Sequence, residues 1–124
     1  MAAFSKVLLS DSTQGRGIKV VATSTAGTAI HSTGTSSSIQ DELWLYAFNS
    51  HTADVLLTVE FGNATAPDSN ITITIKFDEG LFLVVPGLIL TGSGSAAATV
   101  KAFAATANVV TITCLLYTSP SPRD

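Results

Sequence analysis

The sequence DELWLYAFNSHTADVLLTVEFG, at residues 41–62, decides the fold predicted for the whole chain. It indicates a hairpin of two β-strands joined by a short polar turn at residues 49–54, whose side chains suit turns. The second strand alternates loosely. We expect its inward residues to be Val55, Leu57 and Val59, and its outward residues to be Thr58 and Glu60.

The first strand, residues 43–48, is apolar on both faces. One face carries Leu43, Leu45 and Ala47, and the other carries Trp44, Tyr46 and Phe48. A strand that is apolar on both faces is normally covered on both faces. We therefore expect it at the centre of a two-layer structure, with Trp44 and Tyr46 in the core.

Further strands are predicted on both sides of this pair. The clearest is residues 71–77, ITITIKF, in which Ile71, Ile73, Ile75 and Phe77 should face inward. Pro86-Gly87 should form a corner that carries the chain from one sheet to the other. The remaining predicted strands are residues 4–10, 18–23, 28–31, 81–85, 88–91 and 108–113.

Residues 96–107 fit both helical and extended spacing. Alanine favours a helix, but Lys101 would be the only charge on its outer face, so we predict a strand. Seven to nine short strands with almost no helix predict an all-β fold: a single antiparallel β-sandwich or jelly-roll domain over residues 1–113.

The composition limits the classes of partner. Hydrophobic residues make up 46% and charged residues 12% of the 124 residues, and the net charge is −3. Scattered basic residues argue against nucleic acid. The longest apolar run is broken at Pro86, so we expect no membrane span, and the N-terminal residues predict no signal peptide. Cys114 is the sole cysteine, which excludes an intrachain disulfide.

The last residues, 114–124 (CLLYTSPSPRD), differ in character from the β-rich sequence before them. They resemble the translation of a transposon-type sequencing adapter. This resemblance implies a non-native tail that replaces the natural C-terminus, in which Cys114, Tyr117, the two prolines and Arg123 carry no function.

No catalytic, cofactor-binding or metal-ligating residue is predicted. His51 and Asp54 lie in the predicted turn, where polarity explains them better than a metal site. Asp41 and Glu42 are adjacent on a predicted strand, so their side chains point to opposite faces and cannot act as one carboxylate pair. Asp78 and Glu79 lie in a tight turn, where solvated charges explain them better than a glycosidase-like pair. The glycine-rich residues 91–95 lack the lysine of a phosphate loop and suit a flexible turn. A hydrolase would need His31 or His51 to reach both a nucleophile and a carboxylate.

Several sequence segments resemble segments of small structural proteins of tailed bacteriophages. They are GIKVVATSTAGTAIHST, DELWLYAFN, LLTVEFG, GLFLVVPGLILTG and AFAATANVVTIT, which lie within residues 1–113. The resemblance implies a non-enzymatic virion protein without cofactors: a capsid decoration or cement protein, or a head–tail or fibre-associated subunit. It would be made in the host cytoplasm and would form homo-oligomers, we expect trimers, that contact other virion proteins. The alternative is a jelly-roll carbohydrate-binding module, for which Trp44 and Tyr46 could stack on a sugar.

Overall fold

The computed structural model describes residues 5–62 and 68–118, apart from the side chain of Cys114. This part of the chain contains strands but no helix, which confirms the all-β prediction. The strands are β1 (Ser5–Leu8), β2 (Ile18–Lys19), β3 (Thr28–Ser32), β4 (Asp41–Asn49), β5 (Val55–Phe61), β6 (Asn70–Ile75), β7 (Phe82–Leu90), β8 (Thr99–Ala104) and β9 (Val110–Thr118).

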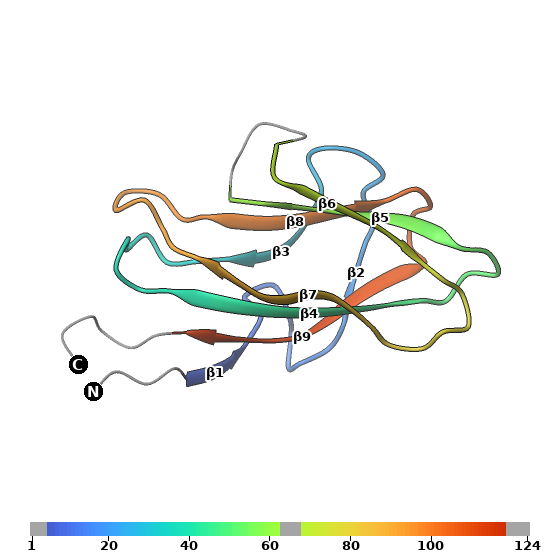
Figure 1. Cartoon of the computed structure of the whole chain (residues 1–124), viewed down its shortest axis with the longest axis horizontal. Helices are drawn as coiled ribbons and strands as arrows, with labels where there is room; N and C mark the ends of the chain where they lie inside the picture. The colour runs from blue at the N-terminus through green and yellow to red at the C-terminus, as the bar shows by residue number, and fades with distance from the viewer. Residues whose placement is uncertain (1–4, 63–67, 119–124) are drawn as a thin grey trace.

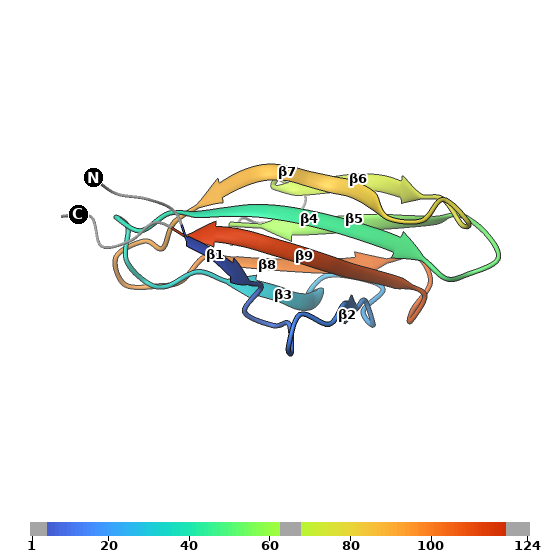
Figure 2. The same ribbon diagram turned by 90° about the horizontal axis from the view of Figure 1, so that it is seen from below.

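The strands form two antiparallel sheets. Sheet A has the order β1-β9-β4-β7, with β2 also paired to β9, and sheet B has the order β3-β8-β5-β6. Figure 1 shows β3, β5, β6 and β8 along one side of the molecule and β1, β4, β7 and β9 along the other, and Figure 2 shows the same layers from below. The predicted antiparallel β-sandwich is therefore confirmed.

The order of pairing distinguishes between the two predicted architectures. The chain pairs from its middle outward: β5 with β6, β4 with β7, β3 with β8, and β1 with β9. Nested antiparallel pairs that are divided between two packed sheets make a jelly roll. The fold is thus a jelly roll in which β1 and β2 together form one interrupted edge beside β9.

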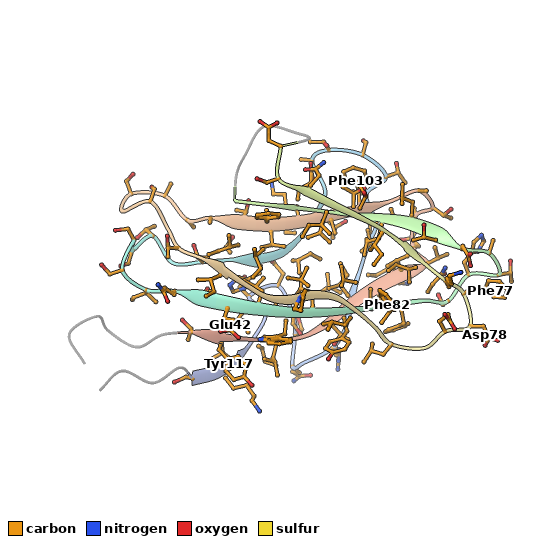
Figure 3. All side chains as sticks on the ribbon, in the orientation of Figure 1. Glu42, Phe77, Asp78, Phe82, Phe103 and Tyr117 are labelled. Atoms are coloured by element: carbon orange, nitrogen blue, oxygen red, sulfur yellow. The ribbon has the colours of Figure 1, made fainter. Side chains whose placement is uncertain are left out.

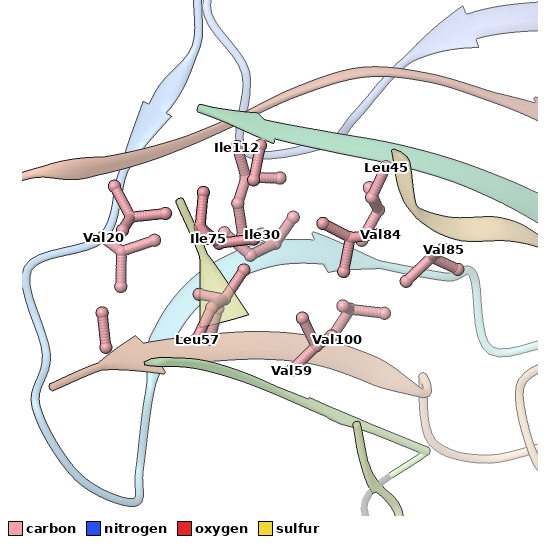
Figure 4. Packing of buried hydrophobic residues seen from close by; sticks show 14 of the residues in the cluster. Val20, Ile30, Leu45, Leu57, Val59, Ile75, Val84, Val85, Val100 and Ile112 are labelled. Atoms are coloured by element: carbon pink, nitrogen blue, oxygen red, sulfur yellow. The ribbon is translucent and has the colours of Figure 1, made fainter. Parts of the chain in front are cut away.

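The core lies between the sheets and is built mainly from branched aliphatic side chains. Leu43 and Leu45 from β4 are 0% and 1% exposed, and Leu57 and Val59 from β5 are both 0% exposed. Figure 4 shows Leu45 and Ile112 of sheet A pointing toward Leu57 and Val59 of sheet B. The inward face predicted for each of these strands is confirmed.

The predicted hairpin at residues 41–62 is wrong in its pairing. Strand β4 belongs to sheet A and β5 to sheet B, so the polar turn carries the chain across the sandwich. A turn sequence shows where a chain changes direction, but sheet membership depends on partners that lie far away in sequence. Thr58 alternates with the inward Leu57 and Val59, as predicted, but it is only 4% exposed and pairs with Phe103 of β8.

Two predictions near β6 and β7 are also wrong. Strand β6 ends at Ile75, so Phe77 lies in the following loop and is 46% exposed. Pro86-Gly87 does not switch sheets, because β7 continues through it beside β4. The register shifts there, and Gly87 has a φ of +89°, as expected for a bulge. Proline is tolerated because β7 is an edge strand.

The predictions for β8 and β2 can also be compared with the structure. Residues 96–107 contain strand β8, which confirms the extended prediction. Strand β2 ends at Lys19, earlier than predicted, because the N–H groups of Val21 and Ala22 both donate to Thr28 Oγ1 at 3.0 Å. These bonds turn the chain toward β3.

The last strand extends past residue 113, the predicted end of the domain. Strand β9 continues to Thr118, and Leu116 is 1% exposed in the core. Leu116 is buried whereas Leu115 and Tyr117 on either side of it are half-buried, which is the alternation of faces expected along a β-strand. The adapter origin of this segment stays a prediction, and residues 119–124, with both tail prolines and Arg123, lie outside the described residues.

Replacement of Gly27 tests how closely the loop between β2 and β3 packs on β8. A Cβ atom added there would lie 2.6 Å from the carbonyl oxygen of Ala102 and equally close to the rest of that backbone. Gly27→Ala should therefore lower the free energy of unfolding by about 1–3 kcal/mol, measured by urea denaturation. Gly34→Ala is the control, because nothing lies within 4 Å of its added Cβ. Equal stabilities for the two variants would contradict this packing.

Candidate binding surface

The outer face of β4 is not covered, contrary to the prediction. Trp44 and Tyr46 are half-buried and Phe48 is 37% exposed, whereas the alternate residues of β4 are buried. In a two-layer sandwich a strand is flanked by its neighbours in the sheet, but only one of its faces meets the core. The prediction that Trp44 and Tyr46 belong to the core is therefore wrong.

Aromatic side chains gather on this outer face where β4 lies beside β9. Trp44, Tyr46, Leu115 and Tyr117 line a shallow cavity of about 250 Å³. We call these four residues the aromatic platform. The register explains the cluster, because Trp44 pairs with Leu115 and Glu42 pairs with Tyr117 across the two strands. Lys6 Nζ lies 6.0 Å from the centre of the Tyr117 ring, at the far limit of a cation–π contact.

The Trp44 ring is held in place by its neighbours. Its Nε1–H donates to Glu42 Oε2 at 2.7 Å, a charge-assisted hydrogen bond. The ring also lies against Gly87 of the β7 bulge, where an added Cβ would come within 3.3 Å of Trp44 Cζ2 and 3.6 Å of Glu42 Oε2. The bulge thus brings a residue without a side chain beneath the indole, and the ring is oriented before any ligand arrives.

A second apolar region lies at the end of the sandwich where β4 and β6 end and β7 begins. Its large side chains are between 36% and 57% exposed. We call this region the apolar end patch: Phe48, Phe77, Leu81, Phe82 and Leu83. Figure 3 shows Phe77, Phe82 and Asp78 toward one end of the molecule and Glu42 and Tyr117 toward the other. The platform and the end patch meet through the pairing of Tyr46 with Leu83.

The structure brings His31 and Asp41 together in the interior. His31 Nε2 and Asp41 Oδ2 are 2.8 Å apart, and their side chains are 5% and 8% exposed. His31 Nδ1 accepts the N–H of Ser10 at 3.0 Å, and Asp41 Oδ1 accepts the hydroxyl of Thr118 at 2.7 Å. Because Nδ1 is an acceptor, the neutral ring carries its proton on Nε2 and donates it to Asp41.

This buried pair ties the two sheets, since His31 belongs to β3 of sheet B and Asp41 to β4 of sheet A. It does not form a hydrolase site. The second ring nitrogen is occupied by a backbone amide, so His31 has no nucleophile to activate. No sequence signal pointed to this pair, because its members lie on different sheets and meet only through the fold.

His51 and Asp54, considered as metal ligands, serve different parts of the turn after β4. The His51 N–H donates to Asn49 Oδ1 at 2.8 Å, whereas Asp54 Oδ1 accepts the N–H of Phe77 at 3.2 Å. His51 and Asp78 border an open hollow of about 420 Å³. Over residues 5–62 and 68–118, no three His, Cys, Asp or Glu residues lie together in an arrangement that could hold a metal ion.

The glycine-rich residues 91–95 form a turn that is held by hydrogen bonds to the Ser93 side chain and to the neighbouring loop. Ser93 Oγ accepts the N–H of Ala96 at 3.0 Å, and the Gly94 N–H donates to the Thr35 carbonyl at 2.7 Å. These bonds pack the turn against residues 34–36. Its amides are used within the protein, in agreement with the predicted turn.

Comparison with known proteins gives this chain no relative by which to identify it. No family model, no curated protein and no solved structure matches it. Among the described residues there is no helix with the length and hydropathy needed to cross a membrane.

Proposed function

We propose that this chain is a non-enzymatic structural subunit of a tailed-phage virion that acts through contacts with copies of itself and with neighbouring virion proteins. A capsid decoration or cement role, or a head–tail or fibre-associated role, follows from the resemblance of its sequence phrases to such proteins. The jelly-roll strand order adds support by analogy, since viral capsid domains are among the proteins that use it.

The observation that carries the proposal is the apolar end patch. Large exposed apolar side chains that gather in one region of a soluble protein mark a surface that a partner covers. Leu81 is 57% exposed and Phe82 is 43% exposed, at one end of a protein with few charged residues. Self-association through this end would remove both side chains from water.

The experiment is a concentration series by light scattering and sedimentation equilibrium. The wild-type chain should form a discrete oligomer, with a trimer expected. Phe82→Ser should weaken association at least tenfold, because it removes an aromatic anchor from the contact. Leu56→Ser is the matched control: Leu56 is 48% exposed, but it lies on β5 of sheet B and is not one of the patch residues. A monomer at millimolar concentration, or equal weakening by both variants, would contradict the proposal.

A further inference from the structure

We infer that the aromatic platform is a binding site for a neutral saccharide. This inference goes beyond the assembly role and does not depend on it. It rests on the half-buried rings of Trp44 and Tyr46 and on the carboxylate of Glu42 beside them. Leu115 and Tyr117 complete the cavity but lie in the segment of predicted adapter origin, so the tests of the site use only Trp44, Tyr46 and Glu42.

The shape of the platform suits a sugar ring. A hexose has one face made largely of C–H bonds, which packs on the face of an aromatic ring. Trp44 and Tyr46 lie two residues apart on one face of β4, so both present side chains to the same surface. The cavity of about 250 Å³ is smaller than the roughly 300–1,000 Å³ clefts that enclose drug-sized ligands. It fits a single ring presented from a chain that continues into solvent.

The polar group beside the platform specifies the ligand further. Glu42 Oε2 accepts the Trp44 Nε1–H at 2.7 Å. A carboxylate offers about four acceptor positions, so one such bond leaves capacity for sugar hydroxyls. Its negative charge opposes that of sialic acids, uronic acids and phosphates, and Lys6, the cation described at the platform, lies over the Tyr117 ring with Nζ 6.0 Å from the ring centre. The chemistry therefore favours a neutral sugar whose hydroxyls donate to Glu42.

The site is preorganised for such a ligand. The hydrogen bond to Glu42 and the contact with Gly87 restrict the orientation of the indole. A ring that is already held in its bound orientation loses little conformational entropy when a sugar stacks on it. These contacts come from β4 and β7, outside the segment of predicted adapter origin.

Trp44 is the only tryptophan of the chain, so its fluorescence reports directly on the platform. The probes are glucose, galactose and N-acetylglucosamine, each also as its β-1,4-linked tetramer, added to the full chain up to about 20 mM. We expect a saturable change in Trp44 emission with at least one tetramer, and a dissociation constant in the range of about 10 μM to 10 mM. No saturable change with any probe would overturn the inference.

Variants then test whether the platform itself binds. Glu42→Gln retains an oxygen that can accept the Trp44 N–H but loses the charge, and it should weaken binding about tenfold. Tyr46→Ala should weaken it similarly. Phe77→Ala is the matched control, because Phe77 is an exposed aromatic residue of the apolar end patch. Calorimetry checks each affinity independently of fluorescence.

Two outcomes would contradict the saccharide site in different ways. If Phe77→Ala reduced the affinity as much as Tyr46→Ala, the sugar would be binding elsewhere or without specificity. If Trp44 emission instead shifted to shorter wavelength with protein concentration alone and sugars had no effect, a second copy would cover the platform. Because Phe82→Ser tests self-association separately, failure of the sugar experiment leaves the assembly proposal to be judged by its own result.

Discussion

Leu57→Ala should lower the free energy of unfolding by about 3 kcal/mol. Leu57 is 0% exposed and lies in the cluster between the two sheets. Its truncation removes apolar contacts and leaves a cavity that the rigid sandwich can fill only in part, so the cost falls in the range of about 2–5 kcal/mol. Leu56 supplies the control one residue earlier in β5, where the side chain is 48% exposed.

Urea unfolding followed by circular dichroism measures this difference. We expect Leu56→Ala to change the free energy of unfolding by less than about 0.5 kcal/mol, as is usual for surface positions. The slope of the transition should stay constant in both variants, which would place the effect in the folded state. Similar losses for the two variants would mean that β5 does not divide its faces between core and solvent as described.

The buried pair of His31 and Asp41 should produce the second large effect. His31→Ala would leave the Asp41 carboxylate in the interior with only the Thr118 hydroxyl as a described side-chain partner, and it would also remove the acceptor for the Ser10 N–H. Removing one member of a buried, hydrogen-bonded pair strands the other, at a cost of about 3 kcal/mol.

Asp41→Asn tests the proton assignment on the ring. An Asn amide can accept the Nε2–H through its oxygen and then must place its NH₂ group toward the Thr118 hydroxyl, which can act as an acceptor. The loss should therefore be smaller, about 1–2 kcal/mol, because the charge assistance is lost but the bonds can re-form.

Asp54→Asn is the control for this pair of variants, since Asp54 is exposed. We expect it to change the free energy of unfolding by less than about 0.5 kcal/mol. A loss for His31→Ala no greater than that for Asp54→Asn would show that the pair does not stabilise the contact between the sheets. Nitrogen chemical shifts of the His31 ring would report its tautomer directly.

The platform was partly visible in the sequence. The alternation of Trp44, Tyr46 and Phe48 showed that these residues share a face of one strand. Whether that face meets a second sheet or solvent is decided by the number of layers that the whole chain builds. Glu42 was considered only as half of a carboxylate pair, because its bond to Trp44 depends on side-chain orientation and not on spacing alone.

The sequence by itself indicated where most strands lie and determined the inward faces of β4 and β5, because a period of two in apolar residues is a local property of an extended chain. It also determined the all-β class, since strand-forming segments recur with little helical pattern. Only the tertiary structure decided the jelly-roll order, the bulge at Gly87, and the meeting of His31 with Asp41. Each of these depends on which distant strands become neighbours, and that choice minimises the exposed apolar area of the whole chain, which no single stretch of sequence encodes.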